Sequence, residues 1–445
     1  MGGCKQNLTK IATGLGLGGL YLFALGAWMS TSLATIGLGL MFIAFILHSV
    51  AFPSIWRDDL LVVSLAFGVY LVPRTIWAIW ELPDLRAVQI HQASRLFQLG
   101  FLAVVLAAFW LARNSRRVSH ILILALTGFL VRMFMWSEPS ELSDFIAGER
   151  ATFGMSPNAF GLYCAVGVLG LLLLARRFCG ARQNRAFLVL RVLAWVAVMV
   201  ILVQGLIFSQ SRGAWLASLI VFPPLLLIHF LVRLRAHDSG VTKRAACLAI
   251  LVVIVTAGLI VFNKNVIKNR ILFELDSLKA IATSDSTNLS PDAYGLRVLW
   301  WRLGLEKWME RPFFGWGPGS VAYLFQNSDN ETIRQKASSH KDFHNSYLQT
   351  LVQVGLVGAA FFIAALWLIF RTAWKAYRAR WLRRDMFLFT VGALALFLVA
   401  SMANLRTRDH FGRFHLTLFG GIAYSFRFSR LRATDKRSDP IGKCD

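Results

Sequence analysis

The sequence lacks the motifs that mark nucleotide-binding proteins and metal-binding proteins. It has no Gly-x-x-x-x-Gly-Lys-Ser/Thr segment and no dinucleotide fingerprint, so nothing in it predicts binding of ATP. His340 and His344 are four residues apart, but no cluster of cysteines or carboxylates completes a metal site beside them. We therefore expect neither a cofactor nor a metal ion.

Acidic residues are also scarce. The chain has 23 Asp and Glu against 47 Lys and Arg, which gives a formal net charge of +24. Such an excess would suggest a nucleic-acid partner if the basic residues formed one patch on a soluble face. They fall instead in short clusters between apolar runs, so we expect no nucleic acid.

Apolar residues dominate what is present. The 445 residues are 56% hydrophobic with a mean hydropathy of +0.57, more apolar surface than a soluble domain could bury around one core. Runs of about 17 to 25 apolar residues predict an all-α polytopic membrane protein with about twelve spans. The predicted spans are 12–30, 32–51, 60–80, 95–112, 118–136, 157–175, 187–208, 214–232, 245–262, 346–370, 386–403 and 412–427.

These spans divide the chain into four parts. We expect spans one to nine in 1–262, a large helical loop domain in 263–345, spans ten to twelve in 346–428, and a cytoplasmic tail in 429–445. Most basic residues of the short connections lie on the same side as both termini, so the positive-inside rule places both termini in the cytoplasm and the large loop outside. All five cysteines then lie in the membrane or inside, where no structural disulfide of the outer face can form.

The large outside loop is predicted to be ordered. Asn265 to Ala282 has the pattern of an amphipathic helix, and Ser290-Pro291-Asp292 is typical of a helix start. The helix that follows is expected to run to Arg311. Because tryptophans suit the headgroup region, we expect this loop to lie against the membrane through the aromatic side chains of Trp300, Trp301, Trp308 and Trp316.

Ser209-Gln210-Ser211-Arg212-Gly213 joins two spans with almost no loop, which puts Arg212 near the outer membrane surface. Two interpretations are open. Arg212 could extend its side chain to lipid headgroups, or it could form an anion site. The Ser211 hydroxyl, the backbone N–H groups of a helix start and a planar guanidinium together suit a diphosphate.

Two further arginines are candidates for an anion site. Arg297 has no acidic residue three or four positions away, whereas Arg302 and Glu306 are spaced as ion-pair partners on a helix. Arg297 therefore either binds an external anion or is a solvated or headgroup-facing arginine. Arg150 follows Glu149 directly, so a local salt pair is the simpler interpretation and a place among the anion-binding cations is the alternative.

His344-Asn345-Ser346-Tyr347-Leu348 stands where the loop re-enters the membrane. A single histidine is usually structural, but a neutral imidazole at a helix start could also take a proton from a hydroxyl group near neutral pH. Asn345 and Ser346 are expected to cap the following helix. Gly355 and Gly358 are expected to be ordinary helix-packing glycines.

The order of Ser-Gln-Ser-Arg-Gly-Ala-Trp-Leu-Ala at 209–217, Gly-Leu-Arg at 295–297, Arg-Pro-Phe-Phe-Gly-Trp-Gly-Pro-Gly at 311–319 and His-Asn-Ser-Tyr-Leu at 344–348 resembles the O-antigen ligase and polymerase superfamily. The resemblance implies a GT-C-like glycosyltransferase of the bacterial inner membrane. Its donor would be an undecaprenyl diphosphate-linked glycan, used on the periplasmic side without metal or nucleotide. It also implies site residues: Arg212 with Ser211 and Arg297 on the diphosphate, His344 as the essential histidine, and Arg150 as a weaker match.

Within this superfamily three acceptors are possible. Lipopolysaccharide ligases transfer the glycan to a sugar of lipid A–core, whereas relatives extend O-antigen or glycosylate proteins. The motifs at 209–212 and 344–347, the moderate length and the lack of an added C-terminal soluble domain favour the ligase. A transporter is the alternative from another class, but transporters tend to carry charges near the membrane midplane. A structural scaffold would leave the outward-facing arginines and histidine without a role.

Overall fold

The computed structural model is all-helical, and the described residues contain no strand. It describes residues 2–49, 53–99, 101–112, 115–136, 143, 150, 152–179, 185–235, 257–269, 272, 293–337, 342–403 and 410–438. These residues form two compact units, each discontinuous in sequence. Unit 1 contains 1–132, 297–382 and 405–445, and unit 2 contains 133–296 and 383–404.

Within the described residues, nine helices are long and apolar enough to cross a membrane, which identifies a multi-pass membrane protein. They coincide with nine of the twelve predicted spans. The other three predicted spans are not among the nine. The spans 12–30 and 412–427 lie mostly in α1 and in the last helix, α18, and most of 245–262 lies outside the described residues. The nine are Thr31–Ser49, Asp59–Glu81, Pro83–Leu111, Arg116–Met135, Pro157–Ala175, Ala186–Phe208, Arg212–Val232, Ser346–Arg378 and Arg384–Ser401.

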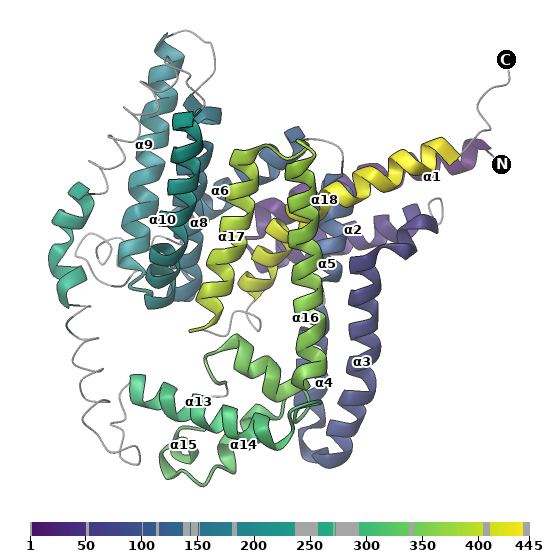
Figure 1. Cartoon of the computed structure of the whole chain (residues 1–445), viewed down its shortest axis with the longest axis vertical. Coiled ribbons are helices and arrows are strands. Elements are labelled where there is room, and N and C mark those ends of the chain that lie inside the picture. Colours follow the sequence, from purple (N-terminus) through teal and green to yellow (C-terminus); the bar gives the residue numbers. More distant parts are fainter. Residues whose placement is uncertain are drawn as a thin grey trace. The chain divides into compact units, whose positions relative to one another are not determined.

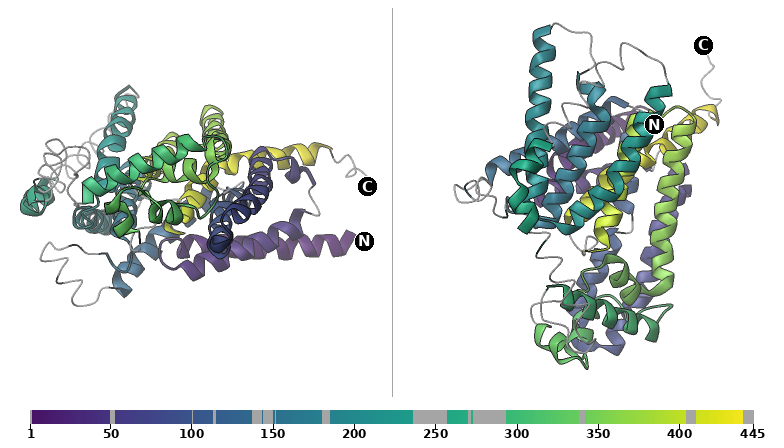
Figure 2. Two further views of the ribbon diagram at one scale, coloured as in Figure 1. Left: turned by 90° about the horizontal axis from the view of Figure 1, so that it is seen from below. Right: turned by 60° about the vertical axis from the view of Figure 1, so that its left-hand side comes forward.

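Unit 1 is built around α3, α5, α16 and α18 (Figure 1). The second half of α16 packs along α3 and α18, and α18 packs along α5; Figure 2 shows α3 and α16 side by side in a second view. The helices of this unit are α1 (Gly2–Gly26), α2 (Thr31–Ser49), α3 (Asp59–Glu81), α4 (Arg86–Leu99), α5 (Leu102–Leu111), α6 (Ser115–Met135, whose last residues belong to unit 2), α13 (Ala293–Glu310, whose first residues belong to unit 2), α14 (Val321–Gln326), α15 (Glu331–Lys336), α16 (Ser346–Arg378) and α18 (His410–Ser438), with two 3₁₀ turns at Pro53–Arg57 and Pro83–Leu85.

Unit 2 contains a group of four packed helices, α8 (Pro157–Cys179), α9 (Arg185–Phe208), α10 (Arg212–Arg235) and α17 (Arg384–Ser401). Arg177 on α8 binds Asp385 on α17 through two hydrogen bonds of 2.9 Å, a bidentate geometry that fixes the two helix ends together. Gly392 permits close packing, because a Cβ there would lie 2.6 Å from Leu169 on α8 and from Leu225 on α10.

Two predicted spans differ from the structure. The span expected at 95–112 falls in the stretch Pro83–Leu111, one of the nine, which is divided into α4 and α5, because Phe101 adopts a left-handed conformation (φ 64°) that a continuous helix cannot contain. The weakly apolar span expected at 412–427 lies in α18, which continues to Ser438. Its polar side chains, including His415 and Thr417, are buried against protein, so this helix does not need a uniformly apolar surface.

The large loop is partly described. The helix expected to run to Arg311 is α13, which ends at Glu310, before Pro312. The predicted helix start at 290–292 and most of the amphipathic helix at 265–282 lie outside the described residues. Trp300 departs from its expected position at the membrane surface: it is 3% exposed and packs inside unit 1, where it contacts Phe325 and His344.

Candidate functional site

The turn between α9 and α10 presents Arg212 as the first residue of α10. Gln210 has a positive φ of 44°, which allows the chain to reverse within three residues. The Ser211 hydroxyl donates to Asn158 on α8 (2.8 Å) and accepts from the Ala214 N–H (3.4 Å), so it caps α10 and ties it to α8. Ser211 is 1% exposed, and its hydroxyl holds the position of Arg212.

Arg150 lies beside this turn. Its Nε donates to the carbonyl oxygen of Ser209 at 3.2 Å, and its side chain is exposed. Glu149, with which a local salt pair was the simpler expectation, lies outside the described residues. The structure therefore brings Arg150, Ser211 and Arg212 together in unit 2, at the start of α10.

His344 occupies a fixed turn in unit 1, just before α16. It has a positive φ of 49°, and its backbone N–H donates to Oδ1 of Asp342 at 2.9 Å. The same carboxylate oxygen lies 3.1 Å from the imidazole Nδ1. If Nδ1 carries the proton, Nε2 is left as an acceptor, which is the arrangement a histidine base requires. Asp342 was missed by the sequence analysis, although a carboxylate two residues before a histidine is a usable signal.

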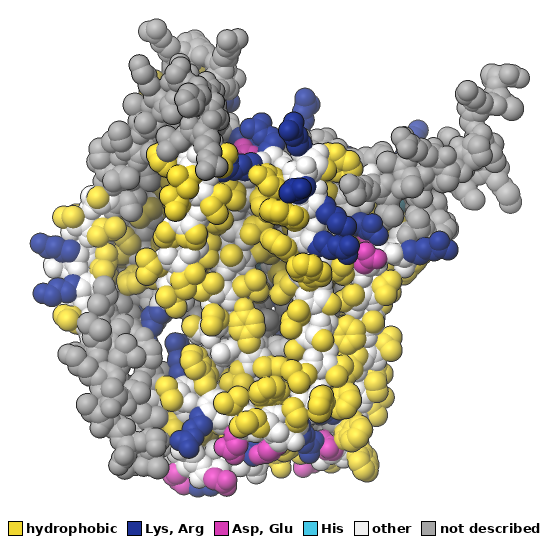
Figure 3. All heavy atoms as spheres, in the orientation of Figure 1, with side chains coloured by type: hydrophobic (Ala, Val, Ile, Leu, Met, Phe, Trp, Pro, Cys, Tyr) yellow, Lys and Arg dark blue, Asp and Glu magenta, His cyan; other side chains and the backbone are white. Residues whose placement is uncertain are grey.

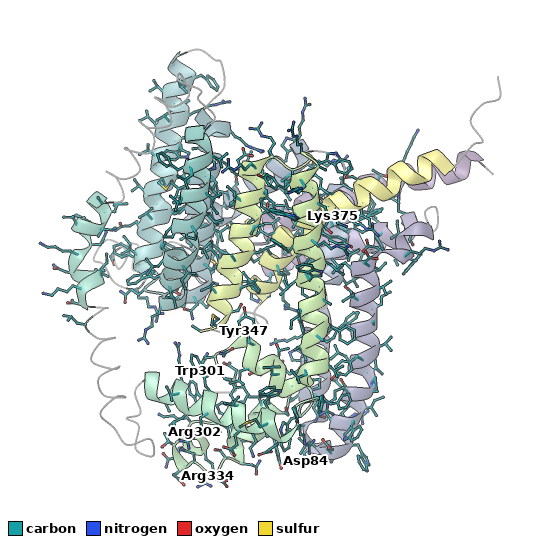
Figure 4. All side chains as sticks on the ribbon, viewed as in Figure 1. Asp84, Trp301, Arg302, Arg334, Tyr347 and Lys375 are labelled. Carbon is teal, nitrogen blue, oxygen red and sulfur yellow. The ribbon has the colours of Figure 1, made fainter. Side chains whose placement is uncertain are left out.

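The helix α13 supports this turn and carries Arg297. Trp300, one helical turn after Arg297, lies with its ring centroid 5.2 Å from that of His344. Trp301 donates from its indole nitrogen to the Phe343 carbonyl at 2.9 Å, on the side of α13 that faces the start of α16 (Figure 4). Arg297 and His344 are thus held on one local framework, in which Gly304 allows α13 to approach Phe343 and Leu348.

The segment Pro312–Gly319 packs against an interruption of α16 at Gly355. At Gly355 the helix has φ 64° and ψ −168°, and it changes direction there (Figure 1). The backbone groups released by the break pair with the segment: Trp316 N–H donates to the Val352 carbonyl (2.7 Å), and Leu356 N–H donates to the Pro312 carbonyl (2.9 Å). Gly355 is therefore not an ordinary packing glycine, because a Cβ there would lie 2.2 Å from the Phe313 carbonyl oxygen.

Arg74 secures the same segment from α3. Its guanidinium donates to the carbonyls of Phe314 (2.9 Å) and Gly315 (2.8 Å), and the residue is 6% exposed. These bonds satisfy an arginine within a membrane-spanning helix, where an unpartnered charge would be costly. Beside it lies a mostly apolar cavity of about 440 Å³, lined by Tyr70, Pro73, Arg74, Trp77, Glu81 and 311–315.

Ion pairs around α13 differ from the expected pattern. Lys307, rather than Arg302, approaches Glu306 (3.9 Å) and bonds Glu310 (2.6 Å). Arg302 is exposed on the face of α13 away from the His344 turn (Figure 4). Arg311 reaches across to Glu81 on α3 at 2.6 Å and stacks on Trp316 at 4.0 Å. Among the described residues, no group of three or more His, Cys, Asp or Glu could hold a metal ion, and His340 is not described.

Residues 197–363 match the family model described as O-antigen ligase. The chain carries a domain of the O-antigen ligase superfamily. The matched residues include Ser211, Arg212, Arg297 and His344, and they end just beyond the break at Gly355; Arg150 precedes them. No curated protein matches the chain.

Members of this superfamily are glycosyltransferase-like enzymes, ligases or polymerases. The O-antigen ligase domain draws on both compact units. Its first part provides the turn with Arg212 in unit 2. Its last part provides α13, the His344 turn and the first helix segment of α16 in unit 1.

Proposed function

We propose that the protein is an O-antigen ligase that transfers a glycan from undecaprenyl diphosphate to a sugar of lipid A–core on the periplasmic face of the bacterial inner membrane. The observation that carries the proposal is the His344–Asp342 pair in the turn before α16, which packs against α13, the helix that bears Arg297, within the O-antigen ligase match. An imidazole oriented by a carboxylate, in a turn that packs against a helix bearing an arginine, fits group transfer from an anionic leaving group.

In the proposed reaction, His344 Nε2 takes the proton of an acceptor hydroxyl while Asp342 holds Nδ1. The hydroxyl oxygen forms the new bond to the anomeric carbon as the bond from that carbon to the diphosphate oxygen breaks. This direct displacement inverts the anomeric configuration and needs no covalent enzyme intermediate. The pair of electrons leaves with undecaprenyl diphosphate.

The arginines stabilise the departing charge. A diphosphate is a good leaving group, so the reaction needs cations more than an acid that protonates it. Arg212, supported by Arg150 at the same turn, and Arg297 supply planar guanidinium groups that suit phosphate oxygens. Ser211 positions Arg212 and acts through it. The arginines perform the role that a metal ion has in other diphosphate enzymes, so the proposed reaction is metal-independent.

The test uses the full chain reconstituted in vesicles with an undecaprenyl diphosphate glycan and purified lipid A–core, in the presence of EDTA. We expect product from the wild type. His344→Ala should lower the rate by ~10²–10⁴-fold, and Arg212→Ala or Arg297→Ala by ~10²–10³-fold each. Arg302→Ala is the matched control, because it removes an exposed arginine from the same helix as Arg297.

The outcomes separate the alternatives. Chain extension of the glycan, or transfer to protein, without transfer to lipid A–core would replace the ligase by the polymerase or the protein O-oligosaccharyltransferase. Equal activity of Arg297→Ala and Arg302→Ala would remove Arg297 from the site. If no glycan transfer is detected under any condition, a membrane transporter becomes the favoured function.

A further inference from the structure

A second polar hollow lies in unit 1, at the end of α16 opposite to Tyr347. Its cavity volume is about 60 Å³, and it is formed where α16 meets the start of α3 and the second half of α18. Figure 4 marks its position by Lys375, and Figure 3 shows Lys and Arg side chains gathered there beyond the hydrophobic band of α3 and α16. The polar lining comprises Asp59, Arg371, Thr372, Lys375, Trp381 and Arg427.

The hollow carries excess positive charge. Arg371 and Lys375 are four residues apart on one face of α16, so their like charges repel each other. Neither forms an ion pair with an acidic side chain in the part of the chain that the structure describes. Basic residues are favoured near the negative, C-terminal end of a helix dipole, and this would explain cations on any face of α16 near Arg378. The helix dipole does not explain why Arg371 and Lys375 share one hollow with Arg427, which lies on α18.

Arg427 is held in place by the two carboxylates at the start of α3. It lies 3.6 Å from Asp58 and 3.5 Å from Asp59. Asp58 is 1% exposed, accepts from the Leu60 and Leu61 N–H groups, and receives the hydroxyl of Tyr424 at 3.0 Å. Burial raises the pKa of Asp58, although these hydrogen bonds and Arg427 act to lower it. Arg427 is therefore a positioned cation, whereas Arg371 and Lys375 supply the uncompensated charge.

The flank of the hollow is typical of a membrane interface. The adjoining face of α16 carries a row of aromatic rings in contact with one another: Trp367, Phe370, Trp374 and Tyr377. The indole side chains of Trp367, Trp374 and Trp381 are 60%, 44% and 49% exposed. The turn after α16 fixes Trp381, because the Trp381 and Leu382 N–H groups both donate to the Ala376 carbonyl. Aromatic side chains gather at the headgroup level of bilayers.

We propose that this hollow binds the headgroup phosphate of an anionic phospholipid, with the acyl chains lying along the aromatic face of α16. The small volume fits one phosphate group, the cations favour a net negative headgroup, and the exposed aromatic face gives a hydrocarbon chain a surface that a free phosphate ion does not need. Basic pockets between membrane helices on the cytoplasmic side are suited to such headgroups. The site is separate from the residues proposed for glycan transfer and does not depend on that function.

The test is native mass spectrometry of the purified full chain with phosphatidylglycerol or phosphatidylcholine of equal chain length. We expect the wild type to retain phosphatidylglycerol in preference to phosphatidylcholine, and Arg371→Gln/Lys375→Gln to lose that retention about tenfold or more. The matched control is Arg378→Gln/Arg380→Gln, which removes the same charge from exposed positions near the hollow but outside its lining. It should retain phosphatidylglycerol within about twofold of the wild type.

Three results would overturn the proposal. Equal retention of the two lipids by the wild type would show that headgroup charge is not recognised. Equal losses in the two double variants would show general attraction to basic residues. Displacement of phosphatidylglycerol by millimolar inorganic phosphate would assign the hollow to a free anion. Thermal unfolding of both variants in detergent, with midpoints close to the wild type, establishes that a loss of lipid is not a loss of fold.

Discussion

Asp342 contributes two contacts to one turn. Its Oδ1 accepts from the backbone N–H of His344 and lies beside the imidazole Nδ1, at 2.9 and 3.1 Å. The first contact supports a residue with positive φ, and the second orients the ring. Trp300 covers the ring from α13. Because Asp342 acts through His344, it is a positioning residue in the proposed reaction.

We expect Asp342→Ala to lower kcat by ~10²-fold or more and Asp342→Asn to lower it less, because the amide oxygen of Asn can still accept from the His344 N–H. KM for the lipid-linked donor should stay within about twofold. The measurement is steady-state glycan transfer by each variant. A fall in thermal stability that matches the fall in rate would show that Asp342 only supports the fold of the turn.

The element that shapes unit 1 is α16, which is interrupted rather than straight. Gly355 separates Ser346–Val354 from the longer segment that ends at Arg378, and Pro312–Gly319 fills the interruption with backbone hydrogen bonds. Arg74 binds the outer side of the same segment. Since the first part of α16 starts directly after His344, the break sets the position of the His344 turn relative to the membrane-spanning part.

Gly355→Ala should destabilise the protein by at least ~1–3 kcal/mol, since its backbone conformation is almost restricted to glycine and its Cβ would lie 2.2 Å from the Phe313 oxygen. Gly39→Ala on α2 is the control, because no atom lies within 4 Å of its Cβ position. Its stability should stay within ~1 kcal/mol of the wild type. Thermal unfolding in detergent measures both. Equal stability of the two variants would contradict the prediction, because it would mean that neither the backbone conformation nor the Pro312–Gly319 segment restricts residue 355 to glycine.

At the scale of the whole molecule, the two compact units divide the candidate residues. Unit 2 holds Arg150, Ser211 and Arg212, and unit 1 holds Arg297, Asp342 and His344. Within unit 1 the residues proposed for chemistry lie at one end of α16, and the basic hollow lies at the other. The proposed topology places these ends on opposite sides of the membrane.

This topology predicts opposite accessibility for two exposed positions of unit 1. In a cysteine-free background, Asp329→Cys should react with a membrane-impermeant maleimide in cells whose outer membrane has been permeabilised, whereas Arg378→Cys should react only after lysis. The cysteine-free parent gives the background signal. The reverse pattern would invert the orientation and move the proposed glycan transfer to the cytoplasmic face.

The sequence alone determined that the protein is helical and spans a membrane several times, because long apolar runs have few other stable folds and hydropathy is a local property. It also indicated the O-antigen ligase superfamily, since motifs are read directly along the chain, and a family match covers residues 197–363. Only the tertiary structure decided the roles of Asp342, Arg74 and Gly355. Arg74 and Gly355 act through residues of another segment, and such contacts depend on packing that no local pattern encodes. Asp342 acts within its own turn, where only the folded geometry shows that its carboxylate meets both the N–H and the Nδ1 of His344. The same dependence on packing explains why Trp300 is buried beside His344.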